Sequence, residues 1–274
     1  MMDSILPHLL AFLLYGLGAI AVGRRCHRQP EEGSRCPRPL DRVLLTAAIL
    51  AHGWGAATLL LSDQGLRLGF APALSLTVWL AALFFWIESF YAPIGWLYIL
   101  LTPIAALVCL LVPWLPLPAT PVAADNPWLR LHLVVALLSY ALFTLAALHA
   151  VLMSVLERAL HRRDPVAWLG RMPPLLVMES LLFRVIGVAF VLLTITVLTG
   201  VVFSETLFGQ PLRSDHKTVF TLLAWAIFGI LLLGRRTWGW RGRVALRWTW
   251  AGFITLVLAY LGTHFVLEYL LQRR

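Results

Sequence analysis

The sequence predicts an all-α membrane protein, a polytopic helix bundle of about eight transmembrane helices with the N- and C-termini outside. Three observations support this prediction. Of the 274 residues, 60% are hydrophobic and 13% are charged, with a mean hydropathy of +0.83. The apolar residues gather in stretches of about 20, the length that crosses a bilayer core of about 30 Å. The basic residues gather between those stretches, so soluble enzyme classes are excluded and residues 1–274 are expected to form a single integral membrane domain.

Eight apolar stretches are expected to form the helices. The first has no lysine or arginine ahead of it and is followed by Arg24 and Arg25, which favours a retained anchor over a cleaved signal peptide. Residues 90–93 make a tight, uncharged connection, so the third and fourth stretches are alternatively one re-entrant pair. The stretches run approximately over residues 5–23, 43–61, 71–89, 94–113, 127–156, 181–203, 218–234 and 248–270.

The lysines and arginines predict the orientation. Fifteen of the 22 lie in the connections after the first, fifth and seventh stretches, six lie on the opposite side, and Arg184 lies within the sixth stretch. Because cytoplasmic connections carry the excess of basic residues, these three are predicted to face the cytoplasm of a bacterium, with the chain in its inner (plasma) membrane. The net charge of +9 then reflects topology, and no nucleic-acid partner is expected. The fifteen are Arg24, Arg25, Arg28, Arg35, Arg38, Arg42, Arg158, Arg162, Arg163, Arg171, Arg235, Arg236, Arg241, Arg243 and Arg247.

Cysteines and short motifs do not predict covalent catalysis. Cys26 and Cys36 fall in a connection predicted to be cytoplasmic and Cys109 falls in the fourth helix, so a structural disulfide is not expected. Cys26, His27 and Cys36 lack the paired spacing of a zinc site. The sequence has no CxxC pair, CxxCH haem-attachment motif, Walker loop or GxSxG elbow.

Three histidines converge on the outer third of the predicted bundle. His132 lies about 7 Å inside the outer end of the fifth helix and His264 about 9 Å inside that of the eighth, while His216 lies where the chain enters the seventh helix. Neutral imidazole is a common axial ligand of haem iron, and a site between two helices needs two such residues at similar depth. Glu268, one turn beyond His264, could fix the tautomer of that ring. The alternative for each histidine is a hydrogen bond to a neighbouring helix.

The other histidines are expected elsewhere. His8 lies near the outer end of the first helix, and His27 and His161 lie in cytoplasmic connections, where a solvated role is expected. His52 lies near the middle of the second helix. His149 is 17 residues beyond His132, about 26 Å along the helix, so the two cannot serve one site. His149 therefore joins His52 in an inner site or bonds a neighbouring helix, and the second interpretation is favoured.

Tryptophans cluster near the predicted membrane surfaces. Trp238, Trp240, Trp248 and Trp250 surround the last basic connection, where indole rings anchor helices at the level of the headgroups. A platform for a cofactor is the alternative.

Several stretches of the second half resemble the cytochrome c assembly family of haem-handling membrane proteins, which includes the CcsA, CcmC and HemX/YpjD branches. The segment from His132 to Ala141 reads HLxxxLxSYA, and residues 198–200, 215–225, 240–243 and 258–262 also match. These stretches run from the fifth helix to the C-terminus, and the family core is expected over about residues 70–272.

The resemblance implies that His132 and His264 are axial ligands of haem at the extracytoplasmic face, and that His52 corresponds to a further intramembrane histidine of the family. Haem lyases carry a WGxxWxWDPKE-type segment before the seventh helix. Residues 208–217 take that place and have no tryptophan, so the resemblance is closer to the HemX/YpjD branch and implies noncovalent binding of haem b, not lyase activity.

The leading hypothesis is therefore a haem-binding inner-membrane protein that acts in cytochrome c maturation or haem homeostasis. His132 and His264 would be the axial ligands, with His216 as a substitute. The haem propionates would pair with the outer cations Lys217, Arg130 and Arg213. The expected partners are membrane lipid, haem and other cytochrome c maturation proteins.

Two alternatives belong to other functional classes. A cofactor-free scaffold or regulatory protein would use its histidines as interhelical hydrogen bonds. A transporter would need buried carboxylates near the membrane centre, and the sequence offers Glu88 and Glu179 near the inner ends.

Overall fold

A computed structural model describes residues 2–28, 38–62, 65–67, 69–91, 95–115, 127–162, 174–202 and 216–259 of the chain. Eight α-helices make up nearly all of these residues, and a 3-10 turn (Val112–Trp114) extends the fourth. A short antiparallel hairpin of strands β1 (Leu61–Ser62) and β2 (Gly65–Leu66), which the sequence did not predict, follows the second helix. The helices are α1 (Met2–Arg28), α2 (Pro39–Leu60), α3 (Phe70–Glu88), α4 (Gly95–Leu111), α5 (Pro127–Arg162), α6 (Leu175–Val202), α8 (His216–Thr237) and α9 (Gly242–Val257).

The helices confirm an all-α polytopic membrane bundle. Seven of them are long and apolar enough to cross a membrane, and α9 contributes 16 further helical residues within the described part of the chain. Helices α3 and α4 are each long and apolar enough to cross a membrane alone, which favours two spans over the re-entrant alternative for this pair. Helix α9 begins at Gly242, six residues before the predicted start, because residues 242–247 are already helical ahead of the apolar core.

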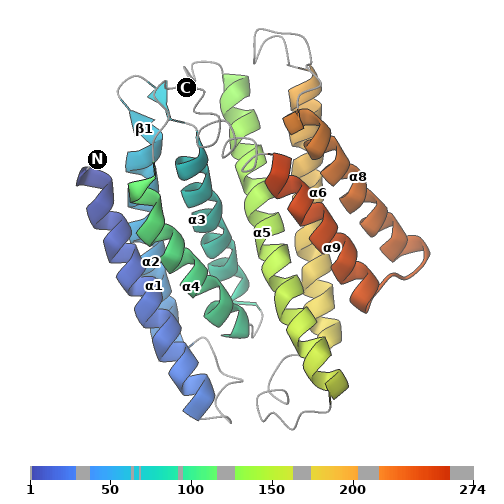
Figure 1. The fold of residues 1–274 in the computed structure, drawn as a ribbon, viewed down its shortest axis with the longest axis horizontal. Coiled ribbons are helices and arrows are strands. Elements are labelled where there is room, and N and C mark those ends of the chain that lie inside the picture. The colour runs from blue at the N-terminus through green and yellow to red at the C-terminus, as the bar shows by residue number, and fades with distance from the viewer. Residues whose placement is uncertain are drawn as a thin grey trace.

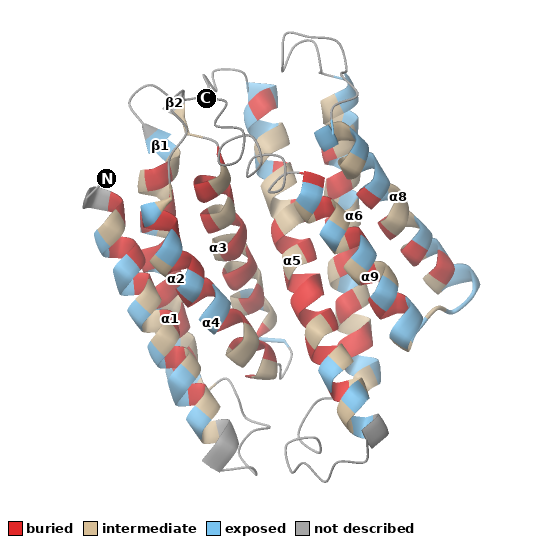
Figure 2. Cartoon of the chain, viewed as in Figure 1, coloured by how far each residue is buried: buried red, intermediate tan, exposed pale blue. Residues whose placement is uncertain are grey.

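Helix α5 lies between two groups of helices (Figure 1). Helices α1 to α4 form one group, α6, α8 and α9 form the other, and α5 packs against α3 and α4 on one side and α6 and α9 on the other. Buried residues dominate α3 and the middle of α5, while α1, α6 and α8 expose apolar faces (Figure 2). Those exposed faces are the surfaces that lipid would cover.

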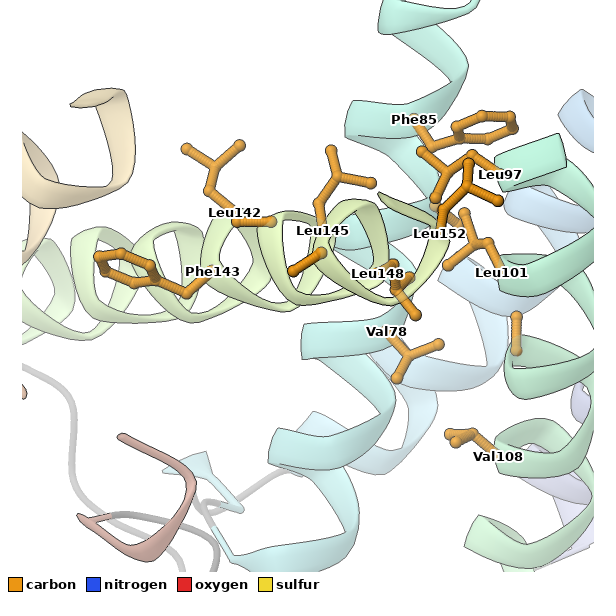
Figure 3. Close-up of a cluster of buried hydrophobic side chains, with 14 of the residues drawn as sticks. Val78, Phe85, Leu97, Leu101, Val108, Leu142, Phe143, Leu145, Leu148 and Leu152 are labelled. Carbon is orange, nitrogen blue, oxygen red and sulfur yellow. The ribbon is translucent and has the colours of Figure 1, made fainter. Parts of the chain in front are cut away.

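The interface of α3, α4 and α5 is a continuous apolar core. Leu145, Leu148 and Leu152 of α5 meet side chains of α3 and α4 (Figure 3). Ala146 and Ala150 of the same helix are completely buried, and small residues at such positions let membrane helices approach closely. The partners on α3 and α4 include Val78, Phe85, Leu97, Leu101 and Val108.

Three ion pairs lie at one end of the bundle, where the predicted basic connections meet the helices. Arg25 at the end of α1 pairs with Asp41 near the start of α2, and Arg235 near the end of α8 pairs with Glu179 near the start of α6. Arg243 of α9 reaches Glu157 near the end of α5, with 2.8 Å between Nε and Oε1. We call this the inner end, following the charge prediction, and the opposite end the outer end.

Candidate functional site

The outer end of α5 presents His132 to α6. The His132 ring is partly buried, its Nδ1 lies 2.9 Å from Oγ1 of Thr199, and a Cβ added at Gly200 would lie 3.4 Å from its Cε1. The sequence predicted a site between the fifth, seventh and eighth helices, and it did not predict this contact with the sixth. The rotation of α5 about its axis decides which neighbour His132 meets, and the sequence does not fix that rotation.

The hydrogen bonds of Thr199 indicate the tautomer of His132. The Thr199 hydroxyl has one proton, and it lies 2.8 Å from the carbonyl oxygen of Ile195, one helical turn earlier. If Thr199 donates to that carbonyl, its oxygen accepts from His132, which makes Nδ1 the protonated nitrogen. The lone pair of the neutral ring is then on Nε2. A histidine that coordinates a metal through one nitrogen usually donates from the other in this manner.

Positive residues accompany His132 at the outer end. Lys217, in the first turn of α8, is near enough for its charge to act on the His132 ring. Arg130, two residues before His132, is exposed, as is His216, the first residue of α8. Arg213 falls outside the described residues, as do His264 and Glu268, so the predicted second axial ligand and its partner stay predictions.

A second histidine cluster lies within α1, α2 and α3. The rings of His8 and His52 are completely buried with centroids 5.7 Å apart, and Nε2 of each lies 3.2 Å from Oγ of Ser75. Nδ1 of His8 lies 2.7 Å from the carbonyl oxygen of Ser4, and Nδ1 of His52 lies 3.5 Å from the hydroxyl of Tyr15. His8, expected near the outer end of its helix, is therefore part of an interhelical network that the sequence did not predict.

The hydrogen bonds of this network allow one consistent set of donors and acceptors. A carbonyl oxygen only accepts, so His8 donates from Nδ1 and accepts at Nε2 from the Ser75 hydroxyl. Ser75 then accepts from Nε2 of His52, whose Nδ1 accepts from Tyr15. Both nitrogens of His52 thus have protein partners, and coordination of iron by His52 would require one of these bonds to break. Its predicted role as a haem ligand stays a prediction.

Replacing the bridging serine tests the network. Ser75→Ala should lower the free energy of unfolding by about 1 to 3 kcal/mol, because it leaves two buried ring nitrogens without their partner. Thermal unfolding of the purified protein in detergent measures the change. Ser180→Ala is the matched control, since the Ser180 hydroxyl donates to Val177 of its own helix. Equal stability of the two variants would contradict the network.

His149 faces a neighbouring helix, and the interpretation that it bonds that helix stays a prediction. Its Nδ1 lies 3.0 Å from the carbonyl oxygen of Leu145, and its Nε2 lies 3.2 Å from Oε1 of Glu88, the last residue of α3. His149 does not contribute to the network around His52. It also lies 17 residues beyond His132, about 26 Å along α5.

The tryptophans at the inner end form a stack. The indole rings of Trp238 and Trp240 have centroids 5.6 Å apart, and those of Trp240 and Trp248 are 5.3 Å apart. Trp240 packs so closely on Gly234 that an added Cβ would lie 2.4 Å from its ring. The stack therefore fixes the turn between α8 and α9, and the anchoring role at the headgroups stays a prediction.

The described residues contain no cluster of side chains that could bind a bare metal ion. No group of three or more His, Cys, Asp and Glu side chains comes together in the part of the chain that the structure describes. Cys109 is buried with a free thiol, while Cys26, His27 and Cys36, whose spacing does not favour a zinc site, fall outside the described side chains.

Comparison with known proteins gives the family. Residues 43–271 match the family described as cytochrome C assembly protein, which is most of the chain. The chain belongs to this family. The match extends from α2 to beyond α9, so it includes His52 and His132.

The alignments with individual relatives cover only part of each relative. The chain is 32% identical over 173 residues to the inner membrane protein YpjD of Escherichia coli K12, covering 63% of the chain and 65% of YpjD. It is 31% identical over 152 residues to the cytochrome c biogenesis protein CcsA of Chlamydomonas reinhardtii, covering 55% of the chain and 41% of CcsA. A 28.8 kDa protein of Azospirillum brasilense is 34% identical over 158 residues, covering 57% of the chain and 58% of that relative. Each alignment thus spans less than two thirds of the relative.

Proposed function

We propose that this chain binds haem b noncovalently at the outer end of α5 and acts in cytochrome c maturation or haem homeostasis in a bacterial inner membrane. The observation that supports it best is the hydrogen bond between His132 and Thr199, which leaves the lone pair of a neutral ring on Nε2 when Thr199 donates to its own helix. Family membership and the printed roles of the relatives, cytochrome c biogenesis for CcsA and the inner membrane for YpjD, support the process and the location.

The residues at the outer end fit a haem. Neutral imidazole is a common ligand of haem iron. His132 would supply one such ligand, and Gly200 adds no side chain beside its ring. His264 would supply the second, with His216 at the start of α8 as the substitute. Lys217 and Arg130 lie at the same end and would pair with the propionates.

This function requires no covalent catalysis by the chain. Its own residues bind and orient the porphyrin, with the Thr199 hydroxyl holding the His132 ring. Membrane lipid covers the exposed helix faces, and other maturation proteins would supply or accept the haem. A haem lyase would need the tryptophan-rich outer segment, which residues 208–217 lack.

A conservative change at Thr199 tests the positioning of His132. Thr199→Val keeps the shape but removes the acceptor for Nδ1, so haem affinity should fall by about 10- to 100-fold, the usual effect of removing a partner of a metal ligand. Titration of the purified protein with haem, followed by visible absorbance, measures the affinity. Thr199→Ser keeps the hydroxyl and should bind nearly as the wild type does. Equal loss in both variants would assign Thr199 a packing role instead.

A second candidate is the cofactor-free scaffold. The observation that favours it is that His8, His52 and His149 all have protein partners on their own or neighbouring helices. In that case His132 would form a further interhelical hydrogen bond, to Thr199. The basic inner connections would bind cytoplasmic proteins. Expression with ample haem that yields a colourless protein would favour this candidate.

A further inference from the structure

The turn between α8 and α9 is rich in positive charge. The two helices lie side by side and meet at the inner end of the bundle (Figure 1). The last turn of α8, the turn itself and the first two turns of α9 hold five arginines, and neither helix contains an acidic residue. The five are Arg235, Arg236, Arg241, Arg243 and Arg247.

Two carboxylates from other helices neutralise part of this charge. Glu179 of α6, whose side chain is 7% exposed, accepts a hydrogen bond from Arg235. Glu157 of α5 accepts from Arg243 at 2.8 Å. Arg241 shares Glu179 more distantly, since its Nε lies 3.8 Å from the same Oε1 and its side chain is 64% exposed. Because one carboxylate balances one guanidinium, Arg241 keeps its positive charge.

Two further arginines lack a counter-charge. Arg236 and Arg247 are exposed, and neither forms an ion pair with a carboxylate in the part of the chain that the structure describes. An exposed guanidinium offers N–H donors in a planar fork that matches the oxygens of a phosphate. We call Arg236, Arg241 and Arg247 the cationic turn.

Arg247 lies within an apolar stripe on the exposed face of α9. The other residues of this stripe follow at helical spacing on both sides of it. Side chains of a helix lean toward its N-terminus, which for α9 is the inner end, so the Arg247 stem can lie on the stripe while its guanidinium reaches the headgroups. The other members are Val244, Ala251, Ile254 and Leu258.

The combination fits an amphiphile better than a soluble anion or an acidic protein. A soluble phosphate would pair with the arginines but leave the apolar stripe uncovered. An acidic protein at the membrane surface would also leave the stripe uncovered where it continues along α9 toward Ile254 and Leu258. A phospholipid with a net negative charge supplies both a phosphate and acyl chains.

We propose that the cationic turn binds an anionic phospholipid of the inner leaflet. The lipid phosphate pairs with Arg241 and Arg247 through charge-assisted hydrogen bonds, and an acyl chain lies along the apolar stripe of α9. The adjacent stack of Trp238, Trp240 and Trp248 belongs to the residue type that gathers at the level of the headgroups. The site is at the other end of α8 from Lys217, so it does not rest on haem binding.

Titration of the purified full-length protein with phosphatidylglycerol in a neutral detergent tests the proposal, with native mass spectrometry to count bound lipids. Dilute lipid in micelles presents no charged membrane surface, so the measurement reports a site. The first phosphatidylglycerol should bind more tightly than phosphatidylcholine with the same acyl chains. Arg247→Gln should weaken that binding about fivefold, the usual contribution of one arginine near anionic lipid. Arg247→Lys keeps the charge and should weaken it less.

Arg24→Gln is the matched control. Arg24 is exposed near the inner end of α1, in the other group of helices, and has no ion pair with a described carboxylate. The variant removes the same charge from the same end of the bundle, and it should bind phosphatidylglycerol as the wild type does. Both variants change exposed side chains, so their thermal unfolding should match that of the wild type.

Four results would overturn the proposal. Equal weakening by Arg247→Gln and Arg24→Gln would reduce the effect to net charge. Equal binding of the two lipids would mean that the turn does not select a negative headgroup. Inorganic phosphate that displaces the lipid at equal concentration would mean that the apolar stripe contributes nothing. Binding of a glutamate-rich peptide that requires Arg247, with lipid binding unchanged in Arg247→Gln, would assign the turn to a cytoplasmic protein.

Discussion

His132→Ala should remove most of the haem absorbance from the purified protein. The change deletes a direct axial ligand, so its effect on haem affinity should exceed the roughly 10- to 100-fold loss expected from removing the hydrogen-bond partner Thr199. The measurement is the Soret absorbance per mole of protein after expression with ample haem and purification in detergent. The loss should appear without a matching loss of folded protein, because the His132 ring is only partly buried.

His161→Ala is the matched control for this experiment. His161 lies on the same helix but near its inner end, so its removal should leave the absorbance unchanged. His264→Ala should shift the ligation spectrum, with His216 available as a substitute ligand. If neither His132→Ala nor His264→Ala alters the pigment, the outer site is wrong.

Asp41→Ala should produce the largest loss of stability among the inner ion pairs, about 3 to 5 kcal/mol. The Asp41 side chain is 3% exposed and pairs with Arg25 of α1, and its Oδ2 accepts from the backbone N–H of Arg38 at 2.9 Å, which caps the start of α2. Removing the carboxylate deletes a buried charge together with its pairing to Arg25 and its cap on α2. Denaturant or thermal unfolding in detergent measures the loss.

Glu157→Ala provides the comparison. Its partner Arg243 is 61% exposed, and exposed pairs contribute only about 0 to 1 kcal/mol. Similar losses for Asp41→Ala and Glu157→Ala would mean that burial does not determine the strength of these pairs. A larger loss for Asp41→Ala would identify the α1–α2 contact as a main source of stability at the inner end.

The fold was largely predictable because the bilayer fixes the length of each apolar stretch. Helix α3 was predicted over residues 71–89 and runs from Phe70 to Glu88. The predictions failed where polar residues extend a helix beyond the apolar core. Helix α6 begins at Leu175 instead of residue 181, because Glu179 in its first turns is neutralised by Arg235 of α8. Nothing in the local sequence of α6 reveals that partner.

The candidate site was predictable in depth but not in its contacts. Counting residues from the helix end placed His132 near the outer end of α5, and the structure agrees. Its contact with Thr199 depends on how α5 and α6 rotate against each other. The same limit explains His8, whose helix is apolar on all sides, so the face that meets Ser75 cannot be read from the sequence. A serine in an apolar helix, as at Ser75, was the available signal.

The visible spectrum of the purified wild-type protein, oxidised and then reduced, tests the central claim most directly. The proposed function predicts a Soret band and reduced-state bands of a haem b with two nitrogen ligands, lost on extraction with acidic organic solvent because the haem is not covalently bound. A colourless protein after expression with ample haem, or a pigment that remains attached through that extraction, would contradict it.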